Sequence, residues 1–299
     1  MPSSYIGRFA PTPSGYLHFG SLLAAVASYL DARHHQGRWL VRIEDLDTPR
    51  NTPGAIDHIL HTLDAYGLHW DGEVVHQSNR LELYQQVIDD WLESGLAYHC
   101  DCSRQSIAAH GGVYPGTCRA RGLPAAADHA VRLRLNDQTI VFQDRLQGEL
   151  RQQPVAISGD FIIRRRDGII AYQLAVVIDD IAQGVTDIVR GADLLDSTPR
   201  QLWLYQLFQQ PAPRYLHVPL VMRLDGEKLS KRLGSAPLEP RQATATLHRA
   251  LSVLAQNPPP QLHTAPVKEQ LDWAATHWQP DRLPAKRQIL DPTTPIPPA

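Results

Sequence analysis

Cysteine and long apolar stretches are both scarce in this chain of 299 residues. Three cysteines, an odd number, are a poor basis for a disulfide framework, which argues against a disulfide-stapled secreted scaffold. No uninterrupted apolar run approaches the length that spans a bilayer, and the opening residues MPSSYIGRFAP contain no apolar signal core. The sequence therefore predicts a soluble, cytoplasmic protein with no membrane partner.

A large excess of charge of either sign is also lacking. The formal net charge is -2, which argues against a protein coated in positive charge. A local basic patch can still bind RNA, and Arg164, Arg165 and Arg166 are one candidate, although a solvated strand end explains the same run. With 43% hydrophobic and 20% charged residues, the composition is that of a folded globular protein.

Strand and helix patterns alternate along most of the chain. A short strand at 5–10 precedes apolar residues at helical spacing in 21–35, and a second strand at 38–43 precedes another helix. A further helix is expected from about 78 to 95, with Leu81 among its inward-facing residues. This alternation predicts an α/β fold with a doubly wound parallel sheet.

The alternation is interrupted once and then resumes. We expect residues 1–97 to form the first half of a catalytic α/β domain and residues 98–160, which contain all three cysteines, to form an insertion. Residues 161–232 would form the second half. Residues 233–299 would form a short C-terminal region with two short helices and a mobile, Pro-rich end.

The stretch APTPSGYLHFGS, residues 10–21, joins the first strand to the first helix. Such a junction directs the unpaired backbone N–H groups and the positive end of the helix dipole toward one spot, which suits a phosphate. Gly20 would let an anion approach the backbone closely, and His18 offers an imidazole beside it. The alternative is that proline, glycine and serine only form a tight connection.

A second stretch, DGEKLSKR at residues 225–232, presents Lys228 and Lys231 on a turn that contains a glycine. At this spacing, both ammonium groups can face one anion. Alone, the stretch is typical of a solvated basic loop. Both stretches are expected at one end of a parallel sheet, where open α/β folds bind ligands, so together they indicate a polyphosphate site.

Four motifs, RFAPTPSGYLHFGS, RIEDLDTPR, GADLLDSTPRQ and KLSKR, resemble signatures of the class I aminoacyl-tRNA synthetases and specifically of their glutamyl branch. The resemblance covers residues 8–232, and the remaining residues are too few for the anticodon-binding domain of full-length glutamyl synthetases. It is closest to a truncated paralogue of that branch. The resemblance implies a class I Rossmann-like catalytic domain that converts L-glutamate and ATP, with Mg²⁺, to glutamyl-adenylate. It also implies transfer of glutamate to the queuosine base in the anticodon of tRNA(Asp).

Two alternatives to this activity stay open on the sequence. One is a short glutamyl-tRNA synthetase that charges the tRNA 3′ end, and the other is a catalytically idle synthetase-like protein that binds tRNA. The complete set of charged residues argues against idleness; the set is His18, Glu44, Arg190, Lys228 and Lys231. We expect the protein to be a monomer.

The resemblance also implies roles for single residues. Glutamate binding would fall on Arg8, Phe9, Ala10, Pro11, Thr12, Glu44, Tyr172 and Arg190, with Glu44 facing the ammonium group. ATP binding would fall on His18, Gly20, Ser21 and Lys231, and catalysis on His18, Lys228 and Lys231. The family's first signature usually ends in a second polar or imidazole group, whereas Ser21 here can only hydrogen-bond, so the lysines and His18 would carry most of the phosphate contacts.

The positions of the charged residues in the sequence also indicate a binding role, independently of the resemblance. Arg8, Glu44 and Arg190 each lie at the end of an apolar strand, where a charge is not buried unpaired. Arginine also suits a planar, bidentate contact with a carboxylate. The alternative is that Arg8 and Glu44 pair with each other as a structural bridge.

The cysteines cluster within the stretch CDCSRQSIAAHGGVYPGTC. Three thiolates in so short a segment, Cys100, Cys102 and Cys118, favour structural zinc over redox chemistry. His99, His110 and Tyr114 are candidates for a fourth ligand, and ligand preference alone favours His110. The synthetase resemblance instead implies Tyr114, with one Zn²⁺ per chain. The alternative is three unligated core cysteines.

Overall fold

The computed structural model describes residues 5–222 and 236–290. Residues 223–235, which include Lys228 and Lys231, lie outside the described residues, as do residues 1–4 and the Pro-rich end from 291 onward. Among the described residues, no helix combines the length and the apolar character that crossing a membrane requires.

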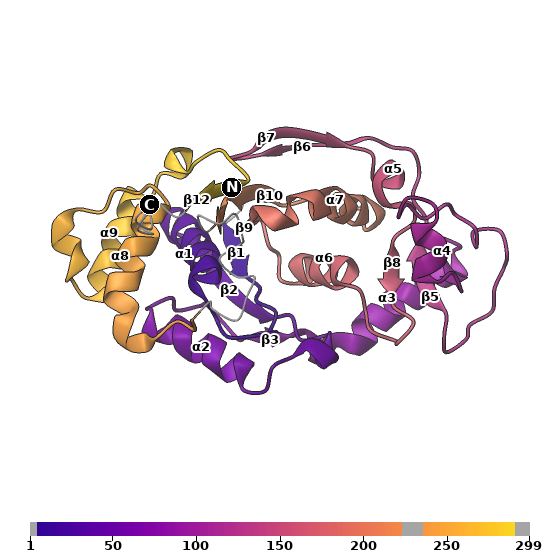
Figure 1. The fold of residues 1–299 in the computed structure, drawn as a ribbon, viewed down its shortest axis with the longest axis horizontal. Helices are drawn as coiled ribbons and strands as arrows, with labels where there is room; N and C mark the ends of the chain where they lie inside the picture. Colours follow the sequence, from indigo (N-terminus) through magenta and orange to yellow (C-terminus); the bar gives the residue numbers. More distant parts are fainter. Residues whose placement is uncertain (1–4, 223–235, 291–299) are drawn as a thin grey trace, which may run out of the picture.

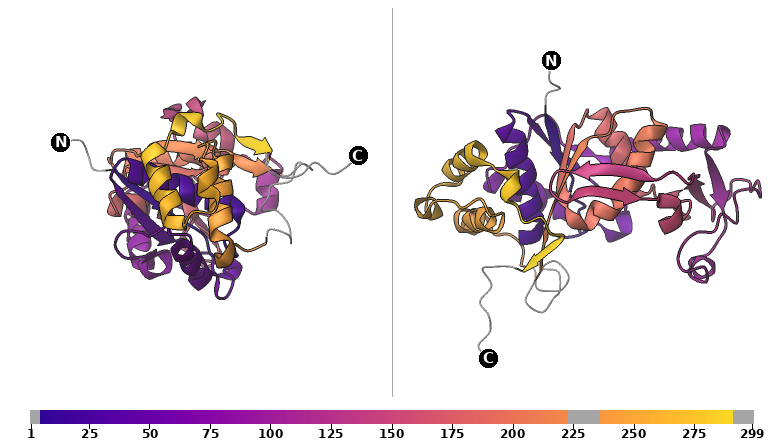
Figure 2. Two further views of the ribbon diagram at one scale, coloured as in Figure 1. Left: turned by 90° about the vertical axis from the view of Figure 1, so that its left-hand side faces the viewer. Right: turned by 90° about the horizontal axis from the view of Figure 1, so that it is seen from above.

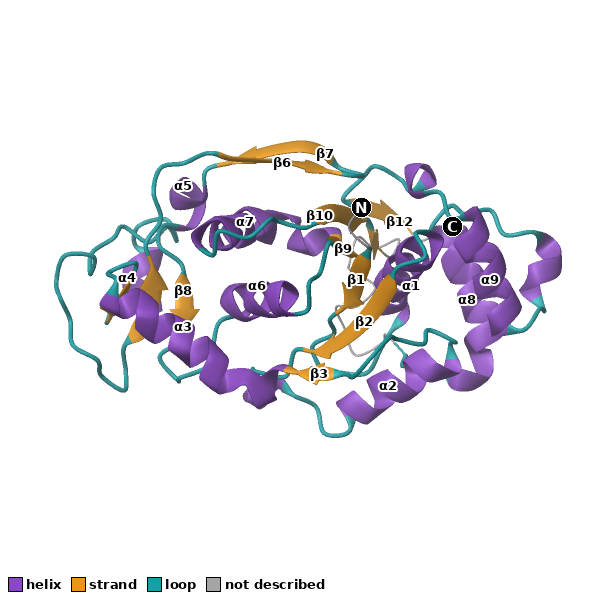
Figure 3. Ribbon diagram, turned by 180° about the vertical axis from the view of Figure 1, so that it is seen from behind, coloured by secondary structure: helices purple, strands orange, loops and turns teal. Residues whose placement is uncertain are grey.

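Two sets of strands form the centre of the molecule (Figures 1 and 3). The first set is parallel and has the order β1-β2-β3, from β1 (Ile6–Phe9), β2 (Arg38–Ile43) and β3 (Val75–His76). The second has the order β7-β6-β10-β9, from β6 (Ile140–Asp144), β7 (Gly148–Gln152), β9 (Asp187–Gly191) and β10 (Arg214–Val218). In this set β6, β10 and β9 are parallel and β7 is antiparallel to β6.

The two sets adjoin where β1 lies beside β9. The backbone N–H of Thr186 donates to the carbonyl of Ile6 at 2.9 Å, directly before β9. The strand order therefore reverses between β1 and β9, which is the switch point of a doubly wound sheet. The predicted fold class is confirmed.

Helices pack around these strands and between them and the far end of the molecule, and their apolar residues form two main buried clusters. They are α1 (Phe19–His34), α2 (Ala55–Ala65), α3 (Leu81–Glu93), α6 (Tyr172–Ala182) and α7 (Thr198–Leu207). In α3, Tyr84, Ile88 and Trp91 are buried, but the prediction for Leu81 was wrong because this side chain is 50% exposed. Leu81 is the first residue of the helix, and its side chain tilts back toward the N-terminus, away from the packed turns.

A small antiparallel sheet lies at one end of the molecule (Figure 2). Its order is β4-β5-β8, from β4 (Ala97–Cys100), β5 (Ala130–Leu133) and β8 (Ile162–Arg164), with the short helices α4 (Arg104–Ala108) and α5 (Pro154–Ser158) near it. Within the segment 98–160, the hairpin β6–β7 returns to the central strands, because β6 pairs with β10. The division into domains stays a prediction.

The C-terminal helices lie at the opposite end and pack against α1 (Figures 1 and 2). They are α8 (Ala243–Val253) and α9 (Val267–His277), followed by β12 (Gln288–Leu290), which pairs in parallel with β11 (Leu220–Met222). The indole N–H of Trp278 donates to Asp31 in α1 at 2.9 Å, and Tyr5 and Arg145 also donate to this buried carboxylate. A satisfied buried carboxylate thus joins three parts of the chain.

Candidate active site and metal centre

A pocket of about 890 Å³ opens where β1 and β9 end, at the switch point of the sheet. Its walls are the connection from β1 to α1, the start of α6, the end of β9 and residues 218–221. It brings together the predicted residues that the structure describes, namely Arg8, Phe9, Ala10, Pro11, Thr12, His18, Gly20, Ser21, Glu44, Tyr172 and Arg190. Ligands of open α/β folds bind at this place.

His18 caps the N-terminus of α1 beside the pocket. Its Nδ1 accepts the backbone N–H of Ser21 at 3.3 Å, and its own backbone N–H donates to Oγ of Ser21 at 2.9 Å. Burial lowers the pKa of His18, which agrees with an imidazole nitrogen that accepts. The reciprocal cap explains Ser21 at this position, because its hydroxyl closes the first turn of the helix.

The absence of a side chain at Gly20 leaves room for the same imidazole. A Cβ at this position would lie 3.1 Å from Cε1 and 3.2 Å from Nδ1 of His18. Gly20 therefore keeps both the imidazole and the backbone at the helix N-terminus accessible to a ligand in the pocket.

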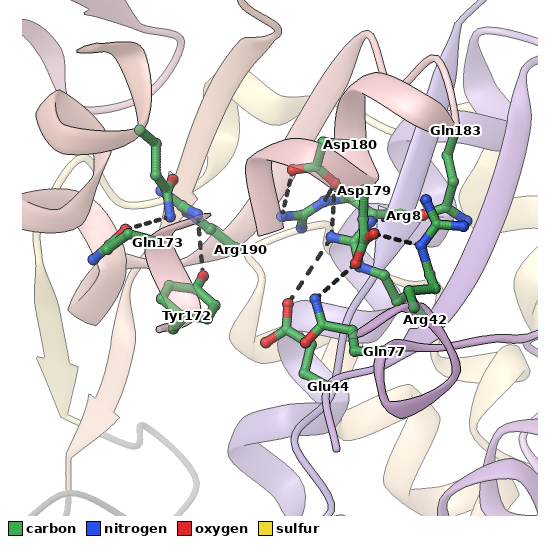
Figure 4. Close-up of polar contacts among 12 residues, drawn as sticks. Arg8, Arg42, Glu44, Gln77, Tyr172, Gln173, Asp179, Asp180, Gln183 and Arg190 are labelled. Carbon is green, nitrogen blue, oxygen red and sulfur yellow. Dashed lines mark hydrogen bonds and ion pairs between the residues drawn. The ribbon is translucent and has the colours of Figure 1, made fainter. Parts of the chain in front are cut away.

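Arg8 is buried and pairs with a carboxylate of α6, not with Glu44. Its Nε and Nη2 lie 3.2 and 3.4 Å from the two carboxylate oxygens of Asp180. Asp180 also accepts from Nη2 of Arg42 at 2.7 Å. Figure 4 shows these groups converging between β1, β2 and α6. The alternative of a structural bridge between Arg8 and Glu44 was wrong.

Glu44 carries an oxygen that can still accept a hydrogen bond. The side chain is 8% exposed, and its buried Oε1 has no hydrogen-bond partner among the described residues, with Nη2 of Arg42 3.9 Å away. Burial raises the pKa of Glu44 to about 7, against the opposing effect of nearby arginines. A cationic ligand would supply the missing partner and favour the carboxylate form.

Arg190 faces the pocket from the end of β9. Its Nη1 lies 3.5 Å from the hydroxyl of Tyr172, while Nη2 donates to Oγ1 of Thr198 at 3.0 Å and to Oε1 of Gln201 at 2.8 Å. Its Nε donates to Nε2 of His217 at 3.0 Å. The guanidinium is thus held on two sides, and its Nη1 edge lies beside the pocket-lining Tyr172 (Figure 4).

Several residues that build this site were missed from the sequence. Asp179 and Asp180 stand in QLAVVIDDIA, where consecutive carboxylates inside an apolar helical run were a usable signal of buried partners. Arg42, inside the apolar strand RWLVRI, was a similar signal. The basic run Arg164–Arg166 makes hydrogen bonds within the chain, to Gln85, to Asp47 and Asp167, and to the carbonyl of Asp101.

The three cysteines converge beside the small sheet. Their sulfur atoms all lie within 4.8 Å of one another, and the sulfurs of Cys102 and Cys118 are 3.5 Å apart. Arg132 places its Nε 3.2 Å from the sulfur of Cys100; although burial opposes ionisation, this hydrogen bond lowers the pKa of that thiol. Soft donors in this arrangement could hold a metal ion.

The two favoured candidates for a fourth ligand differ in position. The hydroxyl of Tyr114 lies 3.6 Å from the sulfur of Cys100 and accepts the backbone N–H of Cys118 at 2.9 Å. His110 is exposed, and its Nδ1 lies 2.9 Å from the carbonyl of Ser106. Tyr114 therefore places an oxygen beside the sulfur atoms, whereas the described Nδ1 contact of His110 is with the carbonyl of Ser106.

The chain is similar to known proteins over most of its length. A family model described as "tRNA synthetases class I (E and Q), catalytic domain" matches residues 6–113 and 119–245. A Pseudomonas aeruginosa protein named glutamyl-Q tRNA(Asp) synthetase is 58% identical over 284 residues, which cover 95% of this chain and 97% of that protein. A protein of the same name from Pseudomonas paraeruginosa is 57% identical over 289 residues, covering 97% of this chain and 98% of the other.

A solved structure shares the fold. The crystal structure of a glutamate tRNA ligase from Elizabethkingia meningosepticum superposes with a TM-score of 0.78 at 23% identity, covering 94% of this chain and 66% of that one. The sequence matches span most of the chain, and the superposition extends the agreement to three dimensions. The chain therefore belongs to the class I tRNA synthetases of the E and Q type, and it is a ligase of the aminoacyl-tRNA synthetase type.

Proposed function

We propose that the protein activates L-glutamate with ATP and Mg²⁺ and transfers the glutamyl group to the queuosine base in the anticodon of tRNA(Asp). A carboxylate oxygen of glutamate attacks the α-phosphorus of ATP, the bond to pyrophosphate breaks, and glutamyl-adenylate forms. A hydroxyl of queuosine then attacks the acyl carbon, loses its proton and releases AMP. The names of relatives that match nearly the whole chain support this substrate pair.

The observation that carries the first step is the charge pattern of the pocket. Glutamate brings two carboxylates and one ammonium group. Arg190 offers a guanidinium whose described partners are neutral, and Arg8, which pairs with Asp180, adds a second guanidinium to the same pocket. Among the described residues, Oε1 of Glu44 has no hydrogen-bond partner and can accept from the ammonium group. Glutamine would leave one arginine without a counter-charge, so the pocket should favour glutamate.

The phosphates of ATP would lie at the N-terminus of α1. Gly20, Ser21 and the imidazole of His18 line this part of the pocket. Lys228 and Lys231 would complete the site, although they lie outside the described residues. Because the nucleophile is already a carboxylate, these groups need to position the phosphates and stabilise charge, and no general base is required.

Pyrophosphate exchange without tRNA tests the activation step. We expect glutamate-dependent exchange that is much faster than exchange with glutamine. Exchange that glutamine supports equally would contradict the pocket assignment. If no exchange occurs with glutamate, either with or without tRNA, the reading as an idle tRNA-binding protein takes its place.

The acceptor is tested separately with a short anticodon stem-loop. A stem-loop that carries queuosine should accept labelled glutamate, whereas the same stem-loop with guanosine should not, because only queuosine supplies the extra diol. Both stem-loops have the same 3′ end, which makes them matched controls. If neither accepts glutamate while unmodified tRNA is charged at its 3′ end, the protein is a glutamyl-tRNA synthetase of the ordinary kind.

We further propose that Cys100, Cys102, Cys118 and Tyr114 hold one structural Zn²⁺, which would cross-link the segment beside the small sheet. Elemental analysis should find about one zinc per chain, consistent with a closed four-ligand site. Tyr114→Phe should weaken zinc retention against a chelator more than His110→Ala does. Protein purified without chelators that contains no zinc would contradict the site.

A further inference from the structure

A buried chain of hydrogen bonds runs behind the pocket, from Asp144 in β6 through His217 in β10 to Arg190 in β9. Oδ2 of Asp144 lies 2.6 Å from Nδ1 of His217, and Nε2 of the same imidazole lies 3.0 Å from Nε of Arg190. The three residues stand on neighbouring strands of one sheet. Their order is therefore set by strand pairing and not by a flexible loop.

The hydrogen-bond partners determine where the imidazole proton lies. Oδ1 of Asp144 accepts the backbone N–H groups of Leu146, Gln147 and His217 at 2.9, 2.8 and 3.3 Å. These bonds fix the carboxylate, and Oδ2 is left to accept from Nδ1 of His217. Arginine can only donate, so Nε2 of His217 must be the unprotonated acceptor for Arg190.

The surroundings keep this imidazole neutral. His217 is fully buried and stacks on the ring of Tyr215, with ring centroids 5.9 Å apart and planes 8° apart. Burial lowers the pKa of His217 to about 4, and the positive charge of Arg190 contributes in the same direction, against the opposing hydrogen bond to Asp144. A proton on Nε2 would point at the Nε–H of Arg190 and break the contact.

We propose that His217 is a positioning residue that orients Arg190 toward a carboxylate of the amino-acid substrate. His217 holds the Nε edge, and Thr198 and Gln201 hold Nη2, so that Nη1 stays directed toward the pocket beside Tyr172. Asp144 acts through His217 by selecting the tautomer that accepts. The inference rests on the proposed glutamate site, because it names what aligns one of its arginines.

Two substitutions at His217 separate positioning from packing. In His217→Gln, the amide oxygen can take the place of Nε2 and still accept from Arg190. In His217→Asn, the shorter side chain keeps a polar group near Asp144 but cannot reach Arg190. His69, whose side chain is 68% exposed, provides a matched His→Asn control.

Asp144→Asn tests the tautomer without changing the shape of the side chain. The backbone N–H groups at Oδ1 require the amide oxygen to stay there, so the new NH₂ group must face Nδ1 of His217. The imidazole proton would then move to Nε2 and oppose the Nε–H of Arg190. This variant serves as the second test if His217→Asn does not fold.

The experiment measures pyrophosphate exchange for the wild type and these variants, together with thermal melting. His217→Asn and Asp144→Asn should raise the KM for glutamate about tenfold or more, as expected for losing a hydrogen bond to a charged group, with the KM for ATP changed less than about twofold. His217→Gln should recover most of the loss, and His69→Asn should match the wild type. Equal KM values for glutamate in all folded variants would overturn the inference and leave the proposed function standing.

A readout without substrate completes the test. Nitrogen NMR of the wild-type imidazole should show a protonated Nδ1 and an unprotonated Nε2 for His217 in the free protein. Protonated Nε2 would overturn the inference whatever the activity. A wild type that shows the expected tautomer but does not activate glutamate would instead contradict the proposed function. It would also contradict the contact between Arg190 and a carboxylate of the substrate.

Discussion

Replacing Glu44 with glutamine should stabilise the free protein at alkaline pH, although it removes a proposed substrate contact. Burial raises the pKa of Glu44 from 4.5 to about 7; Arg42, Arg8 and Arg190 oppose this change, and Asp180 adds to it. The ionised carboxylate is therefore held in the folded protein at a cost. Glutamine keeps the shape and removes the charge, so the cost disappears.

The magnitude follows from the two pKa values. At about 1.4 kcal/mol per pKa unit, a pKa raised from 4.5 to about 7 corresponds to about 3 kcal/mol. Below about pH 4.5 the carboxyl is neutral in both states, so the two proteins should be equally stable. The wild type should lose stability relative to Glu44→Gln as the pH rises from about 4.5 to about 7, and the difference should stay constant above that.

Urea unfolding at about pH 5 and about pH 8.5 measures this difference. The variant should exceed the wild type by less than about 1 kcal/mol at the lower pH and by about 3 kcal/mol at the higher pH. Glu149→Gln, at a position that is 62% exposed in β7, is the matched control and should change little at either pH. Equal stability of Glu44→Gln and the wild type at pH 8.5 would refute the reasoning.

The same variant should lose activity while it gains stability. An amide cannot neutralise the ammonium group of glutamate, so Glu44→Gln should raise the KM for glutamate in pyrophosphate exchange. A substitution that raises the free energy of unfolding and weakens substrate binding identifies a charge that is kept for binding at the expense of stability.

Three further outcomes are expected. Trp278→Phe removes the indole N–H that donates to Asp31 and should lower the free energy of unfolding in urea by about 1–2 kcal/mol. Gly20→Ala would place a methyl group 3.1 Å from Cε1 of His18, so the KM for ATP should rise several-fold. Thermal melting should change little, because the helix propensity gained with alanine offsets the weakened His18 cap. Lys231→Ala should leave melting unchanged and slow glutamate activation about 100-fold or more; a folded variant with near-normal rates would contradict its role.

Local sequence features predicted much of the site because the site is built where strands end. The junction after β1 and the carboxylate after β2 both lie at the carboxyl edge of parallel strands, so Gly20 and Glu44 could be placed without knowing any long-range contact. The cysteines are similarly close in sequence, and their sulfur atoms do converge. Patterns of this kind are readable because their physics is local.

The partners that hold these residues could not be read in the same way. Arg8 and Asp180 are 172 positions apart, and nothing local to either residue indicates that they pair. His217 is a polar residue near the end of the short strand RYLHV, and only the pairing of β10 with β9 and β6 shows what it contacts. Long-range partners of buried charges depend on the completed sheet, so the bridge between Arg8 and Glu44 remained a reasonable but wrong alternative.

The two arginines of the pocket are held by different kinds of partner, and this difference bears on how a substrate can bind. Arg8 shares a carboxylate, Asp180, with Arg42, whereas the hydrogen bonds of Arg190 within the described part of the chain are with neutral groups. An incoming carboxylate therefore gains more at Arg190, where no carboxylate of the described residues already shares the guanidinium. A substrate whose ammonium group meets Glu44 and whose carboxylate meets Arg190 would leave the buried pairs of Arg8 and Arg42 intact. Binding in this arrangement needs no rearrangement of buried ion pairs, whose disruption is costly. The pocket is therefore preorganised for such a substrate.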